Sequence, residues 1–84
     1  MTKEQITKAC DLYLEVLPDP VCGRDIHPMA LSQKMAHVAW MCTELKSPEF
    51  SDDMEKNMRW LGFIQGILWS KGYFTIEELS DHNR

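Results

Sequence analysis

The fold of this chain is decided by residues 58–69, which read MRWLGFIQGILW. On a helical wheel of about 3.6 residues per turn, the large apolar side chains of this stretch occupy well over half of the circumference. The small residues Gly62, Gly66 and Ser70 share the narrow arc that is left, with Arg59 beside them. A helix with so little polar surface needs cover on more than one side. We therefore expect it to be the central helix of the fold or of an assembly.

Two helices are predicted before the central one. The first runs from about Lys3 to Leu17, and Thr2 with Gln5 forms a capping box at its start. The second runs from about Pro28 to Lys46, because proline is favoured in the first turn of a helix. The loop between them is long enough to serve a function and short enough to be a plain connector. The side chains predicted to face the core are Ile6, Ala9, Cys10, Tyr13, Leu14, Val16, Leu17, Leu31, Met35, Val38, Cys42 and Leu45.

The central helix is expected to begin after Ser51 as its N-cap and to end near Gly72. A short fourth helix, residues 76–82, follows the capping box of Thr75 and Glu78. No strand pattern or repeat is present. The sequence thus predicts one all-α domain over residues 1–84, a small helical bundle of three main helices plus a short C-terminal helix. The second and third helices form a hairpin, with the first packed across it and the fourth closing one end.

Composition narrows the possible functions. The 84 residues carry a net charge of −4, which disfavours nucleic-acid binding, and no apolar run is long enough for a membrane span. Three widely spaced cysteines, no CxxC pair and no leader pattern indicate a reducing cytoplasm. Cys22 and His27 alone do not make a zinc half-site, and no motif for nucleophilic or phosphate chemistry is present. We expect no catalytic residue, no metal and no cofactor.

Five side chains are candidates for binding. Trp40 falls on the polar side of the second helix, where it either anchors a partner or is covered by another helix. Arg59 and Trp60 could hold an anionic or planar ligand by charge and stacking, or form an ordinary ion pair beside a core tryptophan. Gln65 is a lone amide in an apolar arc, which either bonds to a neighbouring helix or contacts a ligand. Trp69 belongs to the apolar face of the central helix, and one protomer offers too little surface to bury Trp69 together with its apolar neighbours.

The stripe formed by Gly62, Gly66 and Ser70 lets another helix backbone approach closely. The neighbour is either the first or second helix of the same chain or a helix of a second copy of the chain. A third alternative is that the stripe forms a groove for a small ligand. We expect a homodimer with this stripe at its seam, because twofold dimers are the commonest closed assemblies.

The second half of the chain resembles a group of short, mostly uncharacterised proteins encoded by bacteriophages and prophages of enteric bacteria. The resemblance is carried by RWLGFIQG (residues 59–66), LW (68–69), FTIEEL (74–79) and HNR (82–84), with HVAWMC (37–42) resembling the same group's upstream helix. Residues 59–61, RWL, also resemble the opening of a helix in phage proteins that sequester cyclic-nucleotide signals.

Together these features predict a non-enzymatic phage or prophage accessory protein that binds a host protein. A compact, acidic helical domain with aromatic side chains to spare is suited to that role. The alternative is a module that binds an anionic small molecule, possibly a nucleotide, through Arg59, Trp60 and Gln65.

Overall fold

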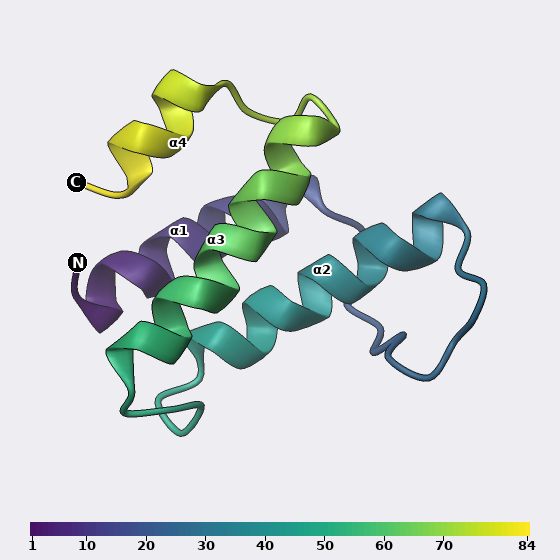
Figure 1. Ribbon diagram of the computed structural model, residues 1–84, viewed down its shortest axis with the longest axis horizontal. Coiled ribbons are helices and arrows are strands. Elements are labelled where there is room, and N and C mark those ends of the chain that lie inside the picture. Colours follow the sequence, from purple (N-terminus) through teal and green to yellow (C-terminus); the bar gives the residue numbers. More distant parts are fainter.

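The computed structural model describes all residues from Met1 to Arg84 and contains four helices and no strand (Figure 1). The helices are α1 (Lys3–Val16), α2 (Leu31–Lys46), α3 (Met54–Ser70) and α4 (Ile76–His82). The prediction of an all-α bundle with three main helices and a short C-terminal helix is confirmed. None of the four combines the length and the apolar character that a membrane span requires.

The long helix α3 crosses in front of α1 (Figure 1). From the short connection that joins them, α2 and α3 diverge like the two arms of a V. The short helix α4 lies on the side of the molecule where both termini are found. A hydrogen bond joins the two ends of the chain there, because Gln5 Nε2 donates to the carbonyl of Arg84 at 2.8 Å.

Both predicted capping boxes are present. The Thr2 hydroxyl accepts from the amide of Gln5 at 3.2 Å, and the Gln5 side chain accepts from the amide of Thr2 at 2.7 Å. The Thr75 hydroxyl likewise accepts from the amide of Glu78 at 3.1 Å, and the Glu78 carboxylate accepts from the amide of Thr75 at 3.0 Å. These pairs satisfy amides that have no partner within the helix, so local sequence alone determines where α1 and α4 begin.

The predicted start of α2 at Pro28 is wrong, since the helix begins three residues later at Leu31. Ala30 is the N-cap, with an extended backbone (ψ of 160°), and its amide donates to the side chain of Gln33 at 2.8 Å. The helix therefore starts only after Ala30. Residues before it stay in the loop, although proline is compatible with a first helical turn.

The predicted N-cap of α3 at Ser51 is also wrong. Asp53 caps the helix instead, because its carboxylate accepts from the amide of Glu55 at 3.0 Å and complements the positive end of the helix dipole. The hydroxyl of Ser51 accepts from the amide of Asp53 at 3.0 Å and so shapes the turn before the helix. At the other end, Gly72 adopts a positive φ of 78° and ends α3 as expected.

Twelve buried apolar side chains from all four helices form one core. They are Ile6, Ala9, Cys10, Tyr13, Val38, Met41, Cys42, Leu45, Leu61, Ile64, Leu68 and Leu79. Two residues predicted for the core are exposed instead, Val16 at 44% and Leu31 at 55%. Each is the terminal residue of its helix, where fewer neighbouring side chains are available to cover it.

Candidate functional site

A groove runs between α2 and α3 on the open side of the V. Toward the wide end of the V the groove holds a cavity of about 300 Å³, and toward the narrow end a more open hollow of about 400 Å³ adjoins it. His37 and Phe63 line both parts, so the two are continuous. We call this the α2–α3 groove. Its lining residues are Met29, Leu31, Lys34, Met35, His37, Val38, Met41, Arg59, Trp60, Phe63, Ile67, Ser70 and Lys71.

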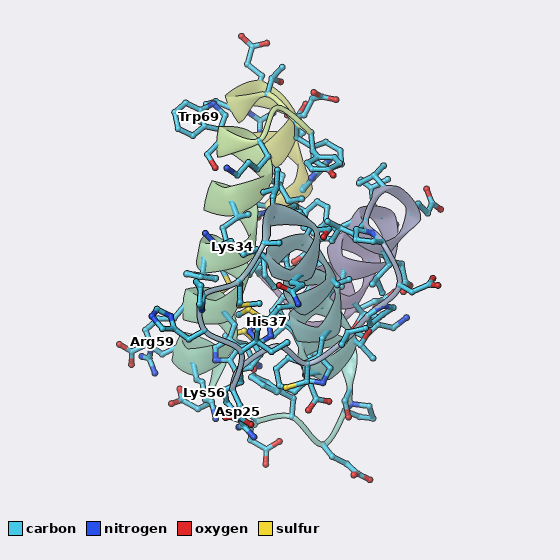
Figure 2. All side chains as sticks on the ribbon, turned by 90° about the vertical axis from the view of Figure 1, so that its right-hand side faces the viewer. Asp25, Lys34, His37, Lys56, Arg59 and Trp69 are labelled. Atoms are coloured by element: carbon cyan, nitrogen blue, oxygen red, sulfur yellow. The ribbon has the colours of Figure 1, made fainter.

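The charged side chains of the groove are all basic. Lys34 lies on α2, Lys71 follows the end of α3, and Arg59 lies at the other end of the groove; no aspartate or glutamate lines it. Lys34 and Lys71 form no ion pair, and Arg59 has only an exposed contact of 3.9 Å with Glu55. Figure 2 shows Lys34 and Arg59 on this side of the molecule. On a chain with a net charge of −4, the lining of the groove is therefore locally positive.

The loop between α1 and α2 is bonded to α2 beside the groove, and its residue Met29 lines the groove. The amide of Val21 donates to the carbonyl of Ala36 at 3.1 Å, and the amide of Gly23 donates to Nδ1 of His37 at 3.0 Å. The second bond places the ring proton of neutral His37 on Nε2. Gly23 is buried, and a Cβ there would collide with the side chain of Met29, which lines the groove.

An aromatic cluster lies beneath the narrower end of the groove. The His37 ring stacks on Trp40 with centroids 5.2 Å apart, and Trp40 lies 6.4 Å from Trp60. Phe50 packs edge-on against Trp60 at 4.5 Å. Trp40 is half-buried and packs against the core as well as against His37. Trp60 is half-buried as well but still lines the groove beside Arg59.

Gln65 lies away from the groove, at the junction of α1, α3 and α4. Its Nε2 donates to the hydroxyl of Tyr13 at 2.9 Å and to Oδ1 of Asn83 at 2.8 Å. The Tyr13 hydroxyl also bonds to Nδ1 of His82 at 2.9 Å. Burial raises the pKa of Tyr13 to about 12. The structure thus brings Arg59 and Trp60 together but separates Gln65 from them, and Gln65 holds α4 to the bundle.

The glycine stripe does not pack within the chain. A Cβ added to Gly62 or Gly66 would meet no atom within 4 Å. The predicted alternative in which the stripe packs closely against the first or second helix is therefore wrong. Trp69 and Ile76 lie on the same side and are 52% and 60% exposed. Gly66, Trp69 and Ile76 line a hollow of about 290 Å³ between α3 and α4, which we call the α3–α4 hollow. Ser70 lines the α2–α3 groove instead, and its hydroxyl donates to the carbonyl of Ile67.

The remaining reactive groups do not gather into a site. No group of three or more histidine, cysteine, aspartate or glutamate side chains is placed to hold a metal ion. Cys10 and Cys42 are buried thiols between α1 and α2, and Cys22 is exposed in the loop. A hydrogen bond to Cys10 and then burial raise the pKa of Cys42 above that of a free thiol.

Sequence reasoning missed most of the groove. Phe63, which is 57% exposed, was read as part of an apolar face in need of cover, and Lys34 and Lys71 were not singled out. The one signal available was Lys71 at the end of the helix that carries this face, since Lys34 lies on a different helix. No protein-family model, curated protein or solved structure matches this chain. Its function is therefore argued from the geometry.

Proposed function

We propose that this protein is a phage or prophage accessory protein that acts without catalysis, by binding a host protein in the bacterial cytoplasm. The observation that carries the proposal is the α2–α3 groove, in which Phe63 and Leu31 expose more than half of their surface. Exposed aromatic and aliphatic side chains beside a hollow are what protein partners bury. The resemblance of residues 54–84 to phage and prophage proteins supports the bacterial setting.

A pull-down from a lysate of an enteric bacterium tests this proposal. The immobilised protein is expected to retain one dominant host protein in stoichiometric amount, and Phe63→Glu is expected to abolish that capture. Val16→Glu is the matched control, because Val16 is also an exposed apolar residue but lines neither the groove nor the α3–α4 hollow. Equal capture by the wild-type chain and both variants would contradict a partner site in the groove.

The same groove supports a second candidate, the binding of an anionic small molecule. Arg59 and Trp60 lie side by side at its narrow end with His37, so charge and ring stacking are available together. Calorimetric titration with a panel of mono-, di- and cyclic nucleotides tests this function. Saturable binding that Arg59→Ala removes would favour it over the host-protein proposal. Gln65 is not expected to contribute, because its amide is engaged with Tyr13 and Asn83.

We also propose that the protein forms a homodimer through the open face of α3. The close approach that Gly62 and Gly66 permit is unused within the chain, and Trp69 and Ile76 offer apolar surface beside them. Sedimentation equilibrium at micromolar concentration is expected to give the dimer mass. Gly66→Leu should weaken association by ~1–3 kcal/mol, because added bulk would hold the two helices apart. A monomer mass for the wild-type chain would overturn the dimer.

A further inference from the structure

The wide part of the α2–α3 groove is an apolar groove in which one more helix can pack. Figure 1 shows that α2 and α3 diverge from their connection, so their far halves lie further apart than their near halves. Val38, Met35 and Ile67 form an apolar floor between these halves. Helices pack with axes about 8–10 Å apart, and an amphipathic helix binds by laying its apolar face into a hydrophobic groove.

The openness of the groove favours a polypeptide over an enclosed small molecule. Pockets for small ligands bury about 70–90% of their ligand's surface. Here Leu31 and Phe63, on opposite walls, are themselves 55% and 57% exposed, so the site is a trough and not an enclosed pocket. Met29 and Met35 also line it, and the flexible thioether side chain of methionine adapts to the apolar face of a docked helix.

Charge identifies the kind of helix. Lys34 lies on the α2 wall and Lys71 on the α3 wall, and neither has an acidic partner within the chain. An amphipathic helix with its apolar face on the floor would bring both of its polar flanks against these two ammonium groups. Carboxylates on the flanks would pair with them, whereas basic flanks would be repelled.

We propose that the α2–α3 groove binds an acidic amphipathic helix, with apolar anchors spaced i, i+3/i+4 and i+7 and with aspartate or glutamate on both flanks. This inference rests on the proposed function, because such a helix would be the segment of the host protein that the groove recognises. It adds the secondary structure and the charge of that segment.

Selection from a displayed library of random 20-residue peptides, with the full-length protein as bait, tests the inference. The selected peptides are expected to share the apolar helical spacing with a net negative charge, and Phe63→Glu should abolish their binding. A synthetic selected peptide should bind the double variant Lys34→Glu/Lys71→Glu about tenfold or more weakly. Replacing its acidic residues with lysine should restore binding to that double variant.

The pair Lys8→Glu/Arg24→Glu is the matched control, because it changes the net charge equally at two exposed basic residues outside the groove. Its affinity for the selected peptide should stay close to that of the wild-type chain. Selected peptides that are basic or extended and proline-rich, or no selected peptide at all, would overturn the acidic helix. So would a self-association that Phe63→Glu removes, since a second copy would then occupy the groove.

The two proposals fail separately. Host-protein capture that depends on Phe63, together with a library that yields no acidic helix, would leave the proposed function standing and refute only this inference. Acidic peptides that bind in the groove, together with no captured host protein, would support the recognition chemistry and refute the host-protein role.

Discussion

Replacing Gln65 with methionine removes three hydrogen bonds from the junction of α1, α3 and α4. Methionine keeps the length and the apolar body of the side chain but offers no amide. The donor to the Tyr13 hydroxyl is lost, together with both bonds that pair the amide of Gln65 with that of Asn83. Because α4 has only seven residues, it depends on such contacts for its position on the bundle.

The expected cost is about 2 kcal/mol, since a buried hydrogen bond between neutral groups contributes about 0.5–1.5 kcal/mol net. Three bonds are lost, but Asn83 is exposed and its freed amide regains water. The Tyr13 hydroxyl keeps its bond of 2.9 Å to His82, so it is not left without a partner. In a domain of this size, 2 kcal/mol lowers the melting temperature by about 8–16 °C.

Thermal unfolding followed by circular dichroism measures the global effect, and amide hydrogen exchange locates it. Exchange should accelerate most in α4, because its docking is what Gln65 secures. Asn83→Ala serves as the partial variant and should cost about two thirds as much, since it removes two of the three bonds and leaves the bond between Gln65 and Tyr13 in place. A melting temperature within about 3 °C of the wild-type value, or exchange that accelerates equally in every helix, would refute the reasoning.

Three further predictions concern the N-cap of α4, the buried hydroxyl of Tyr13 and the accessibility of the three cysteines to reagent. Thr75→Ala should cost about 1 kcal/mol, seen as faster amide exchange in α4, because it deletes an N-cap acceptor. Because burial raises the pKa of Tyr13 from 10.0 to about 12, the unfolding free energy should be insensitive to this group below pH ~10 and fall by ~2–3 kcal/mol as the pH rises to ~12. Urea titrations of the wild-type chain and Tyr13→Phe across this range should differ in that slope. Ellman's reagent should label Cys22 at once in the folded protein, and Cys10 and Cys42 only as the chain unfolds.

The elements that sequence predicted correctly are those whose causes are local. The capping boxes at Thr2 and Thr75 join residues three positions apart, so the pattern is visible along the chain. The predicted starts of α2 and α3 were wrong because several local signals compete there. Proline, serine and aspartate all favour a helix start. The extended backbone of Ala30 determines where α2 begins, and the carboxylate of Asp53 determines where α3 begins.

The roles of the candidate site residues depended on contacts far apart in sequence. Gln65 was visible as a lone amide, but its partner Tyr13 lies 52 residues away, so nothing in the pattern could choose between a structural and a ligand-binding role. The exposure of Phe63 was equally hidden. A helical wheel shows which residues are apolar, whereas the angle at which α2 and α3 diverge decides which apolar side chain stays uncovered.

The two open surfaces of α3 can serve different partners at once. At 100° per residue, Gly66 and Trp69, which line the α3–α4 hollow, lie about 60° and 120° around the helix axis from Phe63 in the same direction, so the hollow and the α2–α3 groove open on neighbouring flanks of the helix. A dimer seam on the first flank would leave the groove of each protomer open. Such a dimer would present two grooves and would bind a dimeric or repeated partner far more tightly than either groove alone, because the second contact forms at high effective concentration. An excess of exposed apolar surface on an 84-residue chain is then divided between self-association and recognition, with α3 contributing to both.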